Sequence, residues 1–154
     1  MSEAARLTKI LCRRFEGLRL RPYFCPAMVA SIGYGATSYL DGRAVQIKDP
    51  AISLDTAERL LDRTVRTIYL PAAIRQCPTA NTFARLAALA DFAFNLGPTR
   101  LKSSTLRKRV LANDWEGAQV EVRKWVRAGG RVLPGLVLRC EARVALMREP
   151  EETP

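Results

Sequence analysis

The sequence predicts an α+β fold that is mostly helical and divided into two lobes, and three patterns support this prediction. Apolar residues recur at helical spacing along most of the chain. Residues 22–47 instead combine β-branched and aromatic residues with Pro and Gly, which is typical of short strands. A single apolar stripe over residues 55–77 predicts a linking helix between these segments. We therefore expect one domain over residues 1–154, with a small antiparallel sheet lobe at about 16–54 and a helical lobe at 78–148.

The first predicted helix ends in an acidic residue. Its apolar face is formed by Leu7, Ile10, Leu11, Phe15 and Leu18. Gly17 favours the end of the helix, so Glu16 is expected at or near the helix C-terminus. The helix dipole disfavours an anion there, and partial burial has the same effect. Glu16 is thus suited to hold and donate a proton, and its helix is expected to pack with the helical lobe.

The sheet lobe is predicted to contain two or three short strands. Asp41-Gly42 is a hairpin turn signal, and the glycines of Ile32-Gly33-Tyr34-Gly35 let a ligand approach the backbone. The linking helix follows, and Pro71 is expected to kink it or to end its regular part.

The helical lobe is expected to form around residues 82–96, which are apolar on almost all sides. Gly97-Pro98 is predicted to stop this helix. Three further helices are expected, at 104–112, at 114–127 with Gly129-Gly130 as its end, and from Pro134 to about Met147. Trp115 and Trp125 share one face of the second of these and are predicted to lie in the core, and residues 149–154 are expected to form a terminal tail.

The composition limits the classes of function. A formal charge of +10 and a pI near 10.1 favour polyanions such as nucleic acid, anionic lipid or the bacterial wall. No apolar run approaches the roughly 18 residues of a membrane span, and the N-terminus lacks the apolar stretch of a signal peptide. We therefore expect a chain made in the cytoplasm, without a signal peptide and without stable membrane insertion. Because there is no histidine, acid–base chemistry must fall to carboxylates, cysteine, tyrosine or lysine.

Four cysteines stand at positions 12, 25, 77 and 140, and none forms a C-x-x-C pair. This spacing argues against a zinc ribbon or a dithiol redox motif. Together with the missing export signal it favours free thiols, with at least one disulfide as the alternative. No motif indicates a metal or an organic cofactor.

The stretch from Phe15 to Thr37 carries the candidate chemistry at a distinctive spacing. Glu16 is followed after nine residues by Cys25 and after six more by Ser31, which opens the segment Ser31-Ile32-Gly33-Tyr34-Gly35. Further distinctive segments are Phe92–Gly97, Ser104–Leu106, Trp125–Gly130 and Gly135–Arg139. In this order, these segments resemble the phage lysozyme family, glycoside hydrolase family 24. A phage, prophage or synthetic origin is compatible with them.

The resemblance implies a lysozyme-like fold and roles for three residues. Glu16 matches the catalytic acid of the family. Cys25 stands where most members have Asp. The resemblance implies that an Asp at this position works with water in an inverting reaction. A thiol there can position water, act as a base or attack carbon as a thiolate, and the alternative is a small apolar filler. Ser31 stands where most members have Thr and is expected to hydrogen-bond the attacking water, with a bond to the backbone as the alternative.

Four further residues are expected to contact the substrate or support the acid. Gly33 and Tyr34 are predicted to line the cleft wall. Asn95 is expected either to contact an N-acetyl sugar from the far lobe or to cap the central helix. Arg139 matches an arginine position of the family and is the candidate partner that holds the Glu16 carboxyl group.

These residues predict a peptidoglycan N-acetylmuramidase that cleaves the β-1,4 bond between N-acetylmuramic acid and N-acetylglucosamine. We expect a monomer without a cofactor or a nucleic-acid partner. The resemblance also implies that the enzyme reaches the wall after membrane permeabilisation. Two alternatives stay open. One is a lysozyme fold that binds wall or membrane through its cationic surface with weak catalysis. The other is a basic nucleic-acid-binding protein, although no recognised motif of that class is present.

Overall fold

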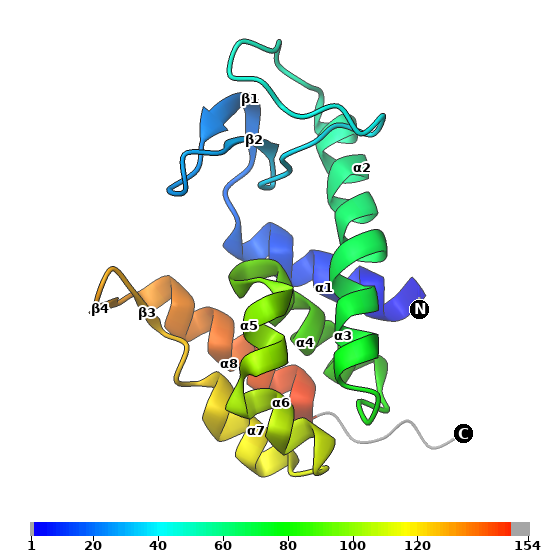
Figure 1. The fold of residues 1–154 in the computed structure, drawn as a ribbon, viewed down its shortest axis with the longest axis vertical. Helices are drawn as coiled ribbons and strands as arrows, with labels where there is room; N and C mark the ends of the chain where they lie inside the picture. Colours follow the sequence, from blue (N-terminus) through cyan, green and yellow to red (C-terminus); the bar gives the residue numbers. More distant parts are fainter. Residues whose placement is uncertain (1, 149–154) are drawn as a thin grey trace.

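The computed structural model describes residues 2–148, which form a mostly helical structure with a small antiparallel sheet at one end (Figure 1). The predicted α+β class is confirmed. The helices are α1 (Ser2–Phe15), α2 (Leu54–Thr64), η1 (Val65–Tyr69), α3 (Leu70–Gln76), α4 (Phe83–Leu96), α5 (Pro98–Ser103), α6 (Thr105–Leu111), α7 (Trp115–Val122) and α8 (Pro134–Arg148). The strands are β1 (Arg19–Phe24), β2 (Ala30–Gly33), β3 (Arg127–Ala128) and β4 (Arg131–Val132). The predicted tail at 149–154 lies outside the described residues.

The sheet lobe is built on the antiparallel pair of β1 and β2, in which Tyr23 lies opposite Ser31. The predicted turn at Asp41-Gly42 is present, because the Gly42 N–H donates to the Tyr39 carbonyl at 2.9 Å. Only isolated bridges form around this turn, so the sheet keeps two strands within residues 2–148. The small core of the lobe consists of Ile32, Ala36, Val45 and Leu60.

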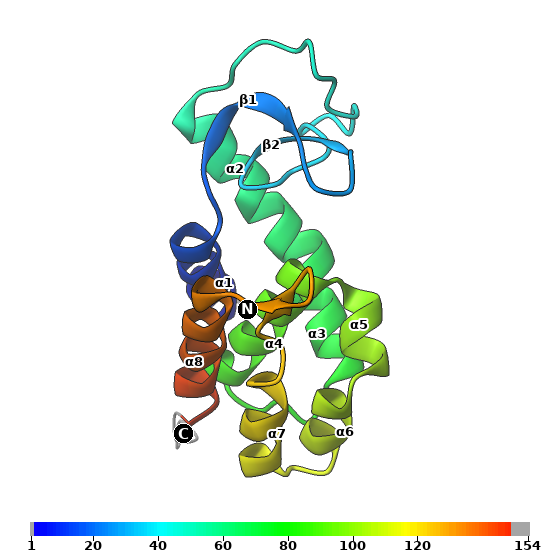
Figure 2. The ribbon, with the colours of Figure 1, turned by 90° about the vertical axis from the view of Figure 1, so that its left-hand side faces the viewer.

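The linking helix is a continuous path through α2, η1 and α3 from the sheet lobe into the helical lobe (Figure 2). The Ser53 side chain caps its start. In η1 the turn is π-helical, since the Leu70 N–H donates to the Val65 carbonyl five residues back. Pro71 has no N–H and leaves the Thr67 carbonyl without its regular partner. The irregularity predicted at Pro71 is therefore a π-turn, and the helical path continues beyond it.

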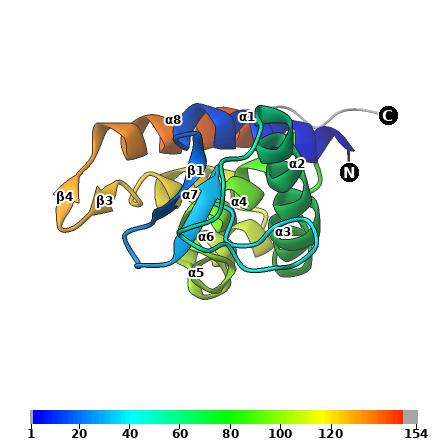
Figure 3. The same cartoon turned by 90° about the horizontal axis from the view of Figure 1, so that it is seen from above.

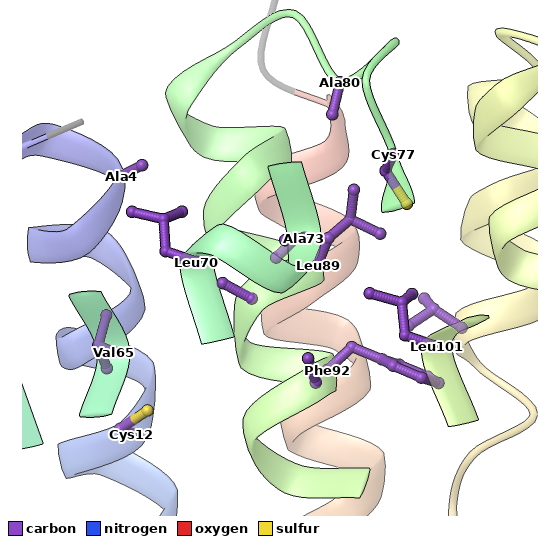
Figure 4. Close-up of a cluster of buried hydrophobic side chains, with 14 of the residues drawn as sticks. Ala4, Cys12, Val65, Leu70, Ala73, Cys77, Ala80, Leu89, Phe92 and Leu101 are labelled. Atoms are coloured by element: carbon purple, nitrogen blue, oxygen red, sulfur yellow. The ribbon is translucent and has the colours of Figure 1, made fainter. Parts of the chain in front are cut away.

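The centre of the helical lobe is α4, as its apolar sequence predicts. It packs against α1, α3, α5 and α8, and Leu89 and Phe92 are fully buried. Figure 4 shows these side chains among residues from α1, η1 and α3. Burying such a side chain contributes about 1.5–3 kcal/mol. Seen from above, α1 and α8 lie along one side of the molecule and contact each other (Figure 3), so the N-terminal helix is part of this lobe.

A short helix that the sequence did not predict follows α4. Gly97, with φ +96°, ends α4 and also precedes α5. Pro98 occupies the first turn of α5, where its missing N–H costs nothing. The prediction that Gly97-Pro98 stops the central helix is correct, but the proline also begins the next one.

The prediction of a helix at 114–127 is wrong for the second half of this range. Helix α7 ends at Val122, and the chain then forms the β3–β4 hairpin. Gly129 and Gly130 are the two loop residues of that hairpin, with φ +56° and +76°. Two consecutive positive φ angles match the tight turn that joins twisted strands, which favours glycine at both positions.

The two tryptophans both pack against the core, although they do not share a helix. Trp115 begins α7 and lies under the Arg85 guanidinium, 4.3 Å from the ring centroid. Trp125 follows α7 and meets Phe92 edge to face at 5.2 Å between ring centroids. None of the helices within residues 2–148 is long and apolar enough to cross a bilayer.

Candidate active site

The candidate site is a groove between the sheet lobe and the helical lobe. Its central part is a cavity of about 500 Å³ at the point where the chain leaves α1 and enters the sheet. The residues around this cavity are Glu16, Tyr23, Cys25, Pro26, Ser31, Tyr34, Gly35, Thr37, Tyr69, Phe94 and Asn95. The chain thus brings together residues from β1, β2, the linking helix and the end of α4.

The central cavity continues on two sides. A second hollow of about 320 Å³ shares Glu16 and Asn95 with it and extends to Leu133 and Leu136 at the start of α8. A smaller hollow of about 90 Å³ shares Gly35, Thr37, Tyr69 and Phe94 and extends to α2. An elongated groove of this kind suits an extended polymer, and Glu16 lies where the two larger hollows meet.

Glu16 directly follows the last residue of α1, as the sequence predicted. Its backbone N–H donates to the Cys12 carbonyl at 2.8 Å, which adds a final hydrogen bond to the helix. The carboxylate side chain is 29% exposed, and its Oε1 accepts a hydrogen bond from Arg139 Nη1 at 2.5 Å. The carboxyl group is therefore open to the groove and held in place from behind.

Cys25 lies at the tip of β1, in a tight turn that runs to Val29. The turn is closed by two backbone bonds, from Cys25 N–H to the Val29 carbonyl at 3.0 Å and from Met28 N–H to the Cys25 carbonyl at 2.8 Å. The pKa of the Cys25 thiol lies below its ordinary value, mainly because the Val29 N–H stabilises the thiolate, with help from the Ala27 N–H. The cysteine is partly exposed and contacts the groove.

Ser31 lies beside Cys25 and has a buried side chain. Its hydroxyl donates to the Val29 carbonyl at 3.1 Å, as the backbone-bonded alternative predicted. This bond uses the proton and leaves the oxygen lone pairs free to accept a hydrogen bond. Ser31 can therefore still accept a hydrogen bond from a bound water.

Tyr34 and Asn95 contribute from opposite lobes. The Tyr34 hydroxyl donates to Glu58 Oε1 at 2.9 Å, so its ring is fixed between the groove and α2. The Asn95 amide oxygen accepts from Arg143 Nη2 at 3.0 Å, and Asn95 borders both larger hollows. The end of α4 is closed instead by the Gly97 N–H, which donates to the Ala93 carbonyl at 2.8 Å.

Comparison with known proteins agrees with this geometry. A family model described as phage lysozyme matches residues 13–143. The chain belongs to the phage lysozyme family. It is 36% identical over 143 residues to an endolysin of Acyrthosiphon pisum secondary endosymbiont phage 1. The matched region covers 89% of this chain and 92% of that protein.

Two solved structures extend the comparison, each with a TM-score of 0.79 and 26% identity. An endolysin from Escherichia coli O157:H7 phage FAHEc1 matches over 94% of this chain and 92% of its own, and the muramidase domain of SpmX from Asticaccaulis excentricus matches over 94% and 97%. The resemblance inferred from the motifs is confirmed. As a phage lysozyme family member, the chain is a peptidoglycan-degrading glycoside hydrolase.

In this family member two predicted site residues lie away from the central cavity. Gly33 has φ +66° and is buried against α2, where a Cβ atom would lie 3.4 Å from the Ala57 Cβ. The position on the groove wall belongs to Gly35 instead. Arg139 borders the second hollow and reaches the site through Glu16.

Several residues at or behind the groove escaped the sequence patterns. Tyr69 and Phe94 form a tilted aromatic pair, with ring centroids 4.9 Å apart, on the groove floor. Tyr23 also borders the groove, and burial raises the pKa of its hydroxyl above the ordinary value. The sequence patterns assigned no groove position to any of these three aromatic residues. The carboxylate of Asp91, buried in α4, accepts hydrogen bonds from Arg139 and was also missed.

The cysteines at 12, 25, 77 and 140 are all free thiols, as the sequence favoured. Cys12, Cys77 and Cys140 are buried, and burial raises the pKa of each thiol. Within the described part of the chain, no three His, Cys, Asp or Glu side chains are grouped as a metal site.

Proposed function

We propose that the chain is an N-acetylmuramidase in which Glu16 donates a proton to the glycosidic oxygen of the β-1,4 bond between N-acetylmuramic acid and N-acetylglucosamine. The observation that carries the proposal is the position of Glu16. It lies where two hollows of the groove meet, partly exposed and paired with a buried arginine. A glycan strand bound in the groove would therefore extend on both sides of the acid.

Hydrolysis also requires a group that handles the attacking water. We assign this part to Cys25 together with Ser31. Backbone N–H groups favour the thiolate of Cys25, and the thiolate accepts the proton of the water as the water oxygen bonds to the sugar carbon. Ser31 accepts a hydrogen bond from the same water. The bond from carbon to the leaving oxygen breaks, and that oxygen takes the proton of Glu16.

The remaining groove residues are assigned to binding. Tyr34 and Gly35 form part of the wall, and the Tyr69–Phe94 pair offers aromatic surface to the apolar face of a sugar ring. Asn95 is assigned to the N-acetyl group through its amide. Gly33 supports the wall from behind.

We further propose that the enzyme acts on the cell wall as a monomer, after synthesis in the cytoplasm and permeabilisation of the membrane. The net charge of +10 supports attraction to the anionic wall. Peptidoglycan, and not nucleic acid or the membrane interior, is the proposed partner. No cofactor enters the proposed reaction.

The test is release of reducing ends from purified peptidoglycan, measured beside turbidity clearing of the same walls. Glu16→Gln should reduce release by at least about 100-fold, since a positioned acid contributes about 10²–10⁴-fold. Glu116→Gln, an exposed change on α7, is the matched control and should keep full activity. Normal release by Glu16→Gln would overturn the assignment of the acid. Clearing without release would instead favour a cationic binding protein.

The role of Cys25 is tested by Cys25→Ser and Cys25→Asp in the same assay. If the thiolate is the base, Cys25→Ser loses most activity, because a hydroxyl is not ionised near neutral pH, and Cys25→Asp retains or gains activity. Full activity of Cys25→Ser would remove the thiol from the chemistry.

A further inference from the structure

Three charged side chains are buried together behind the groove. Asp91 of α4 and Arg143 of α8 are fully buried, and Arg139 of α8 is 2% exposed. Removing charges from water is expensive, and a well-packed apolar cluster would serve stability as well or better. A charge cluster at this position therefore calls for an explanation beyond stability.

Asp91 is the centre of the cluster. Its carboxylate accepts two bonds from Arg139, with Nε to Oδ2 at 3.0 Å and Nη2 to Oδ1 at 2.6 Å. It accepts a third bond from Arg143 Nε at 2.7 Å. The paired bonds to Arg139 fix the plane of that guanidinium, because a fork of two parallel bonds permits one orientation.

Each arginine has a second arm that reaches a groove residue. Arg139 Nη1 donates to Glu16 Oε1 at 2.5 Å. Arg143 Nη2 donates to Asn95 Oδ1 at 3.0 Å. One buried carboxylate thus orients two cations, and these cations hold the proposed acid and the proposed N-acetyl contact.

We infer that Asp91 is a positioning residue that fixes Glu16 and Asn95 through Arg139 and Arg143, an inference that rests on the proposed function. The free-energy cost of burying these charges supports the inference. Arg143 Nη1 is buried and has no hydrogen-bond partner within the described residues, a penalty that a purely stabilising cluster would avoid. The arms that face the groove are all satisfied by groove residues.

Asp91 also sets the charge behind the acid. With Glu16 ionised, two arginines face two carboxylates and the group is neutral. Loss of the Asp91 charge leaves one excess positive charge directly behind the Glu16 carboxyl group. The neighbouring Cys12 thiol, 3.9 Å from Asp91 Oδ1, does not compensate, because burial raises its pKa and keeps it neutral. Tyr23, across the groove, is also neutral near pH 7.

The test variant is Asp91→Asn, which keeps the shape of the side chain and removes its charge. We expect kcat on purified peptidoglycan to fall at least tenfold, with a changed pH–activity profile because the charge behind the acid changes. Affinity for a soluble N-acetylglucosamine oligomer should also fall, because Asn95 loses its orientation. Measurements are made at a temperature where circular dichroism shows the variant folded.

The matched control is Leu89→Ala in the same helix, two residues before Asp91, which removes a fully buried apolar side chain and no charge. It should lower stability but keep the pH profile. If Asp91→Asn does not fold, Arg139→Lys replaces it. Lysine keeps the charge but cannot bind Asp91 and Glu16 in one fixed plane, so the same loss of kcat is expected.

Two results would overturn the inference. One is a wild-type kcat and pH profile in Asp91→Asn, or in Arg139→Lys if that variant replaces it. The other is an equal change in Leu89→Ala, which would reduce the effect to stability. Glu16→Gln is measured in parallel. If it is inactive while Asp91→Asn behaves as wild type, only the positioning role fails, whereas full activity of Glu16→Gln removes the proposed function itself.

Discussion

Replacing Arg139 by methionine tests how much the buried charge cluster contributes to stability. Methionine keeps an apolar stem beside Phe15, whose ring centroid lies 5.7 Å from the guanidinium carbon, and removes only the charged head. Asp91 then loses two of its hydrogen bonds inside the helical lobe. The change isolates the charge from the packing.

The magnitude follows from burial. Removing one partner of a buried ion pair costs about 3–5 kcal/mol, because the remaining charge stays buried. Asp91 keeps its bond from Arg143, and the lost contact to Glu16 is partly exposed, so we expect about 3 kcal/mol. At about 2–4 °C per kcal/mol for a chain of this size, the melting temperature should fall by about 6–12 °C.

The assay is urea unfolding followed by far-ultraviolet circular dichroism, with a thermal scan beside it. Arg123→Met is the control, since the Arg123–Glu141 pair also involves α8 but is 37% and 50% exposed. Its cost should stay within about 0–1 kcal/mol. If both variants lose the same small amount, the buried cluster contributes no more than a surface pair and the reasoning from burial is wrong.

Three further predictions concern the groove and the surface. Gly33→Ala should destabilise by about 1–2 kcal/mol, because alanine must adopt φ +66° while its Cβ finds ordinary room beside Ala57, and a fall in melting temperature measures this. Cys25 should react with iodoacetamide at a lower pH than an ordinary thiol, because its pKa is lowered, whereas Cys77 should stay unmodified at pH 8, because it is buried and its pKa is raised to about 11. Mass spectrometry of tryptic peptides measures the modification of both cysteines. Lytic activity should fall between about 0.1 M and 1 M salt as the screening length shrinks from about 10 Å to 3 Å, and a steady rise would contradict the electrostatic account of wall binding.

Patterns with a strong local cause were predictable from the sequence. The apolar segment that forms α4, the linking helix and the position of Glu16 after α1 all follow from periodicity and from helix-ending glycine. The errors occurred where one residue type serves two purposes. Pro98 was read as a stop but begins α5, and Gly129-Gly130 was read as a helix end but turns a hairpin.

The site was predictable only where a residue touches the groove through a motif. Glu16, Cys25, Ser31, Tyr34 and Asn95 come together around one cavity, as their motifs suggested. The aromatic floor was hidden, because residues with helical spacing look the same whether they face the core or a groove. Gly33 was assigned to the wall because its neighbours are there, but its φ of +66° departs from strand geometry, so regular alternation does not apply and the residue packs against Ala57 of α2.

The sequence contains one indication of the role of Asp91, and it can be interpreted only together with the arginines of α8. It is a single carboxylate within the apolar run that forms α4, and such a charge must be paired if the helix is buried. Arg139 and Arg143 are four residues apart, so they project from one face of α8 and can meet the same partner. The partners are 48 and 52 residues away from Asp91 in the chain, and only the packing of α4 against α8 joins them. The position of the proposed acid therefore depends on three helices, α1, α4 and α8, and substitutions inside the helical lobe can change activity without touching the groove.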